Sequence, residues 1–219
     1  IMLSAKRCGS TAIFNLFQKH PDVKILNVDQ EIINWEPQFW LYALKAIAGD
    51  PQDIKNFNDR LKNTLGFEDS SIEQEYNEDL IFKIFDKILE KFGPNIFDKS
   101  PQYLNSRDAL NLLSKYQKMR TDVKIVIFAF IRHPLDAITS QHELWKQYTK
   151  EKSLAEREKN WLANYKNLEE LQKIMKIKLY KYEEFCSDPK KNTEDLMNYC
   201  GLRNMDFLSS HLKTISLGR

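Results

Sequence analysis

The apolar residues of this chain fall into short continuous runs, which alternate with segments in which apolar residues recur at helical spacing. Residues 123–131 (VKIVIFAFI) form the clearest run, which is typical of a parallel strand covered on both faces. Shorter runs of the same kind predict further extended segments at residues 1–4, 23–28, 95–98 and 177–182.

The segments between these runs carry apolar side chains at positions i, i+3 and i+4, which is the pattern of an amphipathic helix. Helices are therefore predicted at residues 10–19, 37–92 (several, joined by turns), 102–116, 135–150 and 154–175, and two more after the last strand. This alternation predicts an α/β fold of three layers, in which a central parallel sheet with right-handed crossovers is flanked by helices. No repeat or linker divides the chain, so we expect residues 1–219 to form a single domain.

Composition narrows the class of protein. A hydrophobic fraction of 42% and a charged fraction of 29% are ordinary for a globular chain and argue against disorder. Thirty-three basic and 31 acidic residues leave a net charge of +2, so we expect no nucleic-acid partner. The longest apolar run is about seven residues, whereas a membrane helix needs about 20. We expect a cytoplasmic protein without a membrane span, or a Golgi-luminal one if an N-terminal anchor has been removed.

The loop between the first strand and the first helix has the composition of an anion-binding site. Residues 4–11 read SAKRCGST, and a loop in this position aims backbone N–H groups and a helix N-terminus at one point. Gly9 permits close backbone approach, while Ser10 and Thr11 are expected to cap the helix and to donate to an oxyanion. The spacing is that of the nucleotide-binding loop G-x-x-x-x-G-K-[ST], but serines replace its first glycine and its lysine, which disfavours a kinase. An ordinary strand–helix turn is the alternative.

A second candidate site follows the strongest strand. Residues 131–140 read IRHPLDAITS and begin at the carboxyl end of that strand, where open α/β sheets bind ligands. Arg132 and Ser140 together offer a guanidinium fork and a hydroxyl donor for one phosphate. The alternative is that Arg132 simply pairs with Asp136 at the start of the next helix.

Together these segments resemble the sulfotransferases that use 3′-phosphoadenosine 5′-phosphosulfate (PAPS), in their carbohydrate or bacterial type. Members carry P-[KR]-[SA]-G-[TS]-[TS] for the 5′-phosphosulfate and R-x-P-x-[DE]-x-x-x-S for the 3′-phosphate, where this chain has KRCGST and RHPLDAITS. Residues 97–103, 179–189 and 216–219 look like the family's [DE]-K-[ST]-P-x-[YF], R-Y-E-[DE]-[LF]-x-x-[DN]-P and S-x-G-R-W segments. The resemblance implies the related P-loop-like fold, and it leaves only residues 37–92 without a counterpart, as a helical insertion on the acceptor side.

The resemblance also implies roles for single residues. It assigns the PAPS site to Arg7, Cys8, Gly9, Ser10, Thr11, Arg132, Ser140, Tyr182 and Arg219. Arg7 stands where members contact the transferred sulfuryl group, and Cys8 departs from the usual Ser or Ala without altering the backbone cradle. Tyr182 stands at an adenine-contacting tyrosine, or else it is a packed aromatic residue. Arg219 reaches the 3′-phosphate, or else it belongs to a frayed terminus.

The catalytic base is less directly indicated. Sulfuryl transfer needs in-line attack, a base and cations, and the family needs no metal. The histidine of the cytosolic K-T-H-x-P motif is absent, because residues 99–101 read KSP. Carbohydrate-type members use a glutamate in K-E-x-x-[FY], which we align with residues 30–35, so that Glu31 is the first candidate base. Asp98 is the second candidate, His142 is a remote third, and Lys99 completes the predicted catalytic set with Arg7.

The leading hypothesis is therefore an enzyme that moves a sulfuryl group from PAPS to a hydroxyl or amine, and releases 3′-phosphoadenosine 5′-phosphate (PAP). The acceptor is left open among carbohydrate, lipid and small metabolite. Two alternatives stand beside it: a P-loop kinase of a small metabolite, which requires ATP and Mg²⁺, and a non-catalytic nucleotide-binding protein of the same fold.

Overall fold

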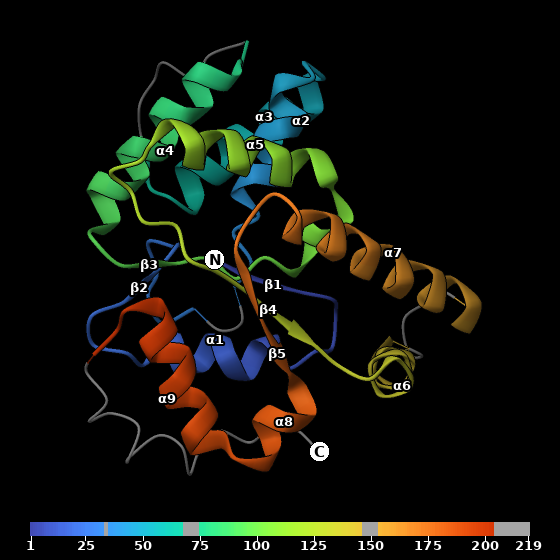
Figure 1. Ribbon diagram of the computed structural model, residues 1–219. Helices are drawn as coiled ribbons and strands as arrows, with labels where there is room; N and C mark the ends of the chain where they lie inside the picture. Colours follow the sequence, from blue (N-terminus) through green and yellow to red (C-terminus); the bar gives the residue numbers. More distant parts are fainter. Residues whose placement is uncertain (33–34, 68–74, 146–152, 204–219) are drawn as a thin grey trace.

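The computed structural model describes residues 1–32, 35–67, 75–145 and 153–203, and Figure 1 shows its arrangement. Its strands are β1 (Met2–Ser4), β2 (Lys24–Ile25), β3 (Ile96–Phe97), β4 (Ile127–Ile131) and β5 (Ile177–Lys181). They form two parallel sheets, with the orders β1-β4-β5 and β2-β3. A parallel bridge from Met2 to Lys99 joins the sheets, so that the strands run in the order β2-β3-β1-β4-β5.

The helices are α1 (Ser10–Gln18), α2 (Phe39–Ile47), α3 (Pro51–Asn63), α4 (Glu78–Phe92), α5 (Arg107–Met119), α6 (Pro134–Trp145), α7 (Leu154–Gln172), α8 (Tyr182–Ser187) and α9 (Pro189–Cys200), with a short 3₁₀ helix η1 (Pro101–Asn105). Figure 1 places α1, α8 and α9 on one side of the sheet and α2 to α5 on the other. No helix in these described segments has the length and apolar character that crossing a membrane requires.

Two hydrophobic cores confirm the predicted three layers. Side chains alternate along β4: Ile127 and Ala129 belong to the core beneath α2 to α5, whereas Phe128 and Phe130 belong to the core beneath α1 and α9. Leu3 and Met2 of β1 divide between the same two cores. Because successive side chains of a strand point to opposite faces, a continuous apolar run here means a sheet buried on both faces.

Two predicted elements are shorter or divided in the structure. The strand predicted at 123–131 begins only at Ile127, because Ile127 pairs with the first residue of β5, and Phe128 pairs with the first residue of β1. Residues 123–126 therefore have no neighbouring strand. The helix predicted at 102–116 is divided into η1 and α5 at Ser106, whose extended backbone ends η1 and whose Oγ accepts a hydrogen bond from the Ala109 N–H.

Candidate active site

The loop between β1 and α1 has the backbone geometry of an anion cradle. Arg7 and Gly9 both have left-handed backbone, with φ of +68° and +83°. For Arg7 this conformation costs about 1–3 kcal/mol, the kind of strain that accumulates at ligand sites. Gly9 is the N-cap of α1, and no side chain caps that end. The prediction that Ser10 or Thr11 caps the helix is therefore wrong, because Ser10 is already the first helical residue.

The second predicted element meets this loop directly. The Arg7 Nε donates to Ser140 Oγ at 3.0 Å, and Arg132 Nη1 donates to the carbonyl oxygen of Arg7 at 3.0 Å. Arg132 forms no ion pair with Asp136 within the described segments, so that alternative is not what the structure adopts. The Arg132 Nε is buried and has no hydrogen-bond partner among the described residues, which leaves a donor available to an added acceptor.

A third segment closes over the loop from the end of β5. Tyr182 lies against Gly9 so closely that a Cβ at position 9 would stand 2.5 Å from two atoms of the tyrosine ring. The Arg132 guanidinium lies 4.6 Å from the centroid of the same ring. Glu183 accepts a hydrogen bond from the His133 N–H at 2.9 Å, which ties the end of β5 to the end of β4. The structure thus brings Arg7, Gly9, Arg132, Ser140 and Tyr182 together.

Cys8 supports the loop from inside. Its side chain is fully buried, and its Sγ lies 3.7 Å from the Tyr165 hydroxyl. That hydroxyl also accepts a hydrogen bond from the Arg132 N–H at 3.1 Å. Burial raises the pKa of the Cys8 thiol to about 11, so the thiol stays protonated near neutral pH and has little nucleophilic character.

We expect Cys8 to resist alkylation in the native protein. Iodoacetamide at pH 8 should modify the half-buried Cys186 well before Cys8, whose labelling should increase only as the pH approaches about 11. Peptide mass spectrometry of native and denatured samples measures both sites, and the denatured sample controls for intrinsic reactivity. Equal native labelling of the two cysteines would contradict the buried position of Cys8.

Asp98 lies in the interior, as the anchor of a hydrogen-bond network. It is 4% exposed, and its carboxylate accepts hydrogen bonds from Ser100 Oγ at 2.7 Å and from the Tyr103 hydroxyl at 2.8 Å. These two hydroxyls in turn accept hydrogen bonds from the backbone N–H groups of Gln38 and Trp40. Burial raises the pKa of Asp98. The observed contacts of Asp98 thus fasten the start of α2 to the end of β3.

Lys99 is paired with a carboxylate that the sequence analysis missed. Its Nζ lies 3.1 Å from Glu36 Oε1, and its side chain is 1% exposed, against 28% for that of Glu36. Burial lowers the pKa of Lys99, and the charge of Glu36 opposes this effect. The ammonium group also lies 5.6 Å from the ring centroid of Phe14 in α1. An ammonium group and a partly exposed carboxylate therefore face each other beside α1.

Glu31, by contrast, is exposed, and its backbone N–H donates to Asp29 Oδ1 at 3.0 Å. A signal for Glu36 was present in the sequence: residues 36–39 read EPQF, which fits the E-x-x-[FY] part of the family pattern. His142 lies in α6, two residues beyond Ser140. Arg219 and the segment 216–219 lie outside the described residues.

Arg60 of α3 holds the backbone of the Glu36 segment. Its Nη1 donates to the carbonyl oxygens of Pro37 at 2.9 Å and Glu36 at 3.3 Å. Its guanidinium lies 3.9 Å from the ring centroid of Tyr42 and donates to that hydroxyl at 3.2 Å. A residue of the helical insertion thus positions Glu36.

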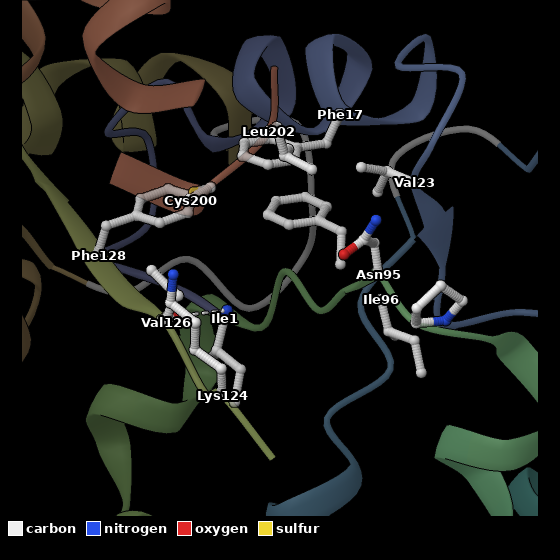
Figure 2. A pocket seen from close by; sticks show the side chains of 12 residues that line it. Ile1, Phe17, Val23, Asn95, Ile96, Lys124, Val126, Phe128, Cys200 and Leu202 are labelled. Carbon is white, nitrogen blue, oxygen red and sulfur yellow. Dashed lines mark hydrogen bonds between the residues drawn. The ribbon is translucent and has the colours of Figure 1, made fainter. Parts of the chain in front are cut away.

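Two cavities differ in position and chemistry. Figure 2 shows the smaller, of about 100 Å³, at the amino ends of the strands, where apolar side chains such as Phe17, Ile96 and Phe128 line it. A larger cavity of about 410 Å³ opens beside the β1–α1 loop, with Lys6 and Pro101 in its wall. The larger cavity is therefore the one next to the candidate site.

Comparisons with known proteins agree with this geometry. A family model described as the sulfotransferase family matches residues 1–206. A sulfotransferase from Alicyclobacillus acidocaldarius is 16% identical, with a TM-score of 0.55 over 92% of this chain and 81% of its own. A sulfotransferase domain from the curacin biosynthetic pathway is 13% identical, with a TM-score of 0.54 over 92% of this chain and 73% of its own. At these identities the two structures show a shared fold. A search of curated proteins gave no match.

Proposed function

Because this chain belongs to the sulfotransferase family, we propose that it is an enzyme that transfers a sulfuryl group from PAPS to a hydroxyl or amine of an acceptor. The observation that carries the proposal is the contact between two segments more than 100 residues apart: Arg7 donates to Ser140, and Arg132 donates to the backbone of Arg7. One ligand with two separate anionic groups accounts for a site of this form, because each segment alone offers donors for one of them.

The residues at the site fit the donor nucleotide. Among the described residues no side chain caps the start of α1 after Gly9, so its first backbone N–H groups are available to an anion. The buried Arg132 Nε lacks an acceptor, which a 3′-phosphate held by Arg132 and Ser140 would supply. Tyr182 offers a ring beside both segments for the adenine. Ser10 and Thr11 complete the predicted 5′ side, and a cradle built from backbone groups tolerates Cys8.

We assign the base to Glu36 in place of Glu31. A base needs a carboxylate that reaches solvent or substrate while its surroundings keep it in place. Glu36 meets this requirement through its pair with Lys99, its partial exposure and the hold of Arg60 on its backbone. Asp98 is enclosed by Ser100 and Tyr103, and we assign it to positioning.

Different residues of this chain then contribute to different parts of the sulfuryl transfer. PAPS supplies a sulfuryl group attached to a phosphate leaving group. Glu36 accepts the proton of the attacking hydroxyl as the new sulfur–oxygen bond forms and the bond between sulfur and the 5′-phosphate oxygen breaks. Arg7 stabilises the electron pair that remains on that phosphate oxygen, and Lys99 keeps the Glu36 carboxylate in position. These contributions are positioning and electrostatic stabilisation, as in phosphoryl transfer.

A thermal-shift measurement tests the nucleotide. A ligand that binds only the native state raises the unfolding temperature, and saturation at about 100 times its dissociation constant adds about 2.7 kcal/mol to stability. We expect PAP to raise the midpoint by several degrees and ATP with Mg²⁺ to leave it nearly unchanged. A shift with ATP and Mg²⁺ alone would support a kinase, and PAP binding without labelling of any acceptor from radiolabelled PAPS would support a non-catalytic protein.

A further inference from the structure

The larger cavity lies between α6, α7, η1 and the β1–α1 loop, and its volume of about 410 Å³ suits a small molecule. Its wall includes Lys6, which precedes Arg7, and Pro101, which follows Lys99 by two residues. The cavity therefore begins beside both the predicted sulfuryl-binding loop and the segment that holds the base. Figure 1 shows α7 extending past α6 at this side of the molecule.

Three of the α7 residues that line this cavity are asparagines, and they stand beside Arg157, Trp161 and Ala163. Asn160, Asn164 and Asn167 line the cavity at positions i, i+4 and i+7, so that they share one face of the helix. The same face continues toward the core as Leu168 and Leu171, which are buried. Along this face, leucine gives way to asparagine where the helix leaves the core, and Asn160 at the outer end is exposed.

Asn164 supplies the decisive observation. It is 8% exposed and lines the cavity, and its side-chain amide makes no hydrogen bond to the protein within the described segments. Asn167, in contrast, donates to the Leu104 carbonyl at 2.7 Å, and Gln141 donates to the Lys6 carbonyl at 3.2 Å. Asparagine is a poorer helix former than leucine, so an amide at position 164 that hydrogen-bonds to no described residue does not serve the helix.

The aromatic lining adds a second feature. Trp161 stacks on Tyr165 with ring centroids 3.9 Å apart, and its buried indole N–H has no hydrogen-bond partner in the part of the chain that the structure describes. Tyr165 is the residue that contacts both Cys8 and Arg132. The wall of the cavity is thus connected, through one aromatic pair, to the predicted nucleotide site.

We propose that this cavity is the acceptor subsite and that it binds a polyhydroxylated molecule, namely a carbohydrate or another polyol. An amide group both donates and accepts hydrogen bonds, as a hydroxyl does, so the three asparagines and Gln141 match several adjacent hydroxyls. An apolar alcohol or a phenol would offer the Asn164 amide too few hydrogen bonds and is disfavoured for that reason. The proposal rests on the proposed function, because it takes the sulfuryl group to be delivered at Arg7.

The first experiment asks whether Asn164 serves the fold or a ligand. Asn164→Leu is compared with Lys166→Leu, a control at an exposed position of α7. If the amide is reserved for a ligand, Asn164→Leu should raise the unfolding midpoint of the unliganded protein, by about 2–4 °C for each kcal/mol gained in a chain of this size. A midpoint that is unchanged or lower would overturn the proposal. This measurement needs no knowledge of the acceptor.

The second experiment measures transfer from radiolabelled PAPS to two groups of probes. Cellobiose, maltose, lactose and myo-inositol represent polyols, and 1-hexanol and 4-nitrophenol represent apolar and phenolic acceptors. We expect labelling of polyols. Asn164→Leu should raise the KM for them about 10-fold or more, while the dissociation constant of PAP stays within twofold.

Labelling of hexanol or nitrophenol without any polyol would overturn the proposed polyol subsite but not the proposed sulfotransferase activity. If the protein does not bind PAP, the proposed function itself is wrong. If it binds PAP but labels none of these probes, the unfolding midpoint of Asn164→Leu decides whether the cavity is a ligand site.

Discussion

Replacing Arg132 with alanine is expected to weaken PAP binding by about 10- to 150-fold, which corresponds to about 1.5–3 kcal/mol. The guanidinium is the charged donor of the predicted 3′-phosphate site, and no acceptor within the described segments competes with a phosphate for its buried Nε. Ser140→Ala removes one neutral donor and should cost about 1 kcal/mol. Isothermal titration calorimetry with PAP measures both losses.

Two variants separate the phosphate contact from other effects of the substitution. Arg132→Lys keeps the charge but not the planar fork, so it should recover only part of the affinity. Arg107→Ala removes an exposed arginine at the start of α5 and controls for the change in net charge. Wild-type affinity in Arg132→Ala would mean that this segment is misaligned with the family motif, even though it contacts the β1–α1 loop.

The fold was largely predictable because its signals are local. A continuous apolar run predicts a strand buried on both faces, and both cores meet at β4 as this reasoning requires. Strand limits were less predictable, because they depend on neighbours: residues 123–126 continue the apolar run with one lysine among them, but β1 and β5 pair only with residues from Ile127 onward. The break at Ser106 was overlooked although serine is a frequent N-cap, since the apolar spacing continues across it.

The meeting of the two motifs was predictable for a topological reason. Arg7 and Arg132 follow β1 and β4, and the carboxyl ends of adjacent parallel strands share one edge of a sheet. Nothing comparable indicated that Arg60, in the insertion, would hold the Glu36 backbone, because the contact joins two segments without a shared motif or strand pairing. The role of Asp98 was hidden for a related reason: it acts through two hydroxyls that accept hydrogen bonds from the backbone N–H groups of Gln38 and Trp40, and any sequence possesses such groups.

The distinction between Glu36 and Glu31 leads to the prediction with the largest effect. Glu36→Gln should lower turnover by about 10²–10⁴, the usual contribution of a positioned general base, while the dissociation constant of PAP stays close to that of the wild type. Glu31→Gln is the matched control, because its exposed side chain lacks the pairing with Lys99, and it should retain near-wild-type turnover. Single-turnover transfer from radiolabelled PAPS, together with calorimetry, measures rate and binding separately.

Because Glu36 pairs with Lys99, replacing it affects the stability of the fold as well as turnover, and the two effects have to be measured separately. In Glu36→Gln the almost fully buried ammonium loses its charged partner, so the unfolding midpoint should decrease as well. Glu36→Asp keeps the charge on a shorter side chain and should restore stability more fully than turnover, because proton transfer depends on reach. If Glu36→Gln turns over at the wild-type rate while Glu31→Gln or Asp98→Asn is inactive, the base lies at that other residue. A rate that follows the unfolding midpoint across all four variants would assign Glu36 to the fold alone.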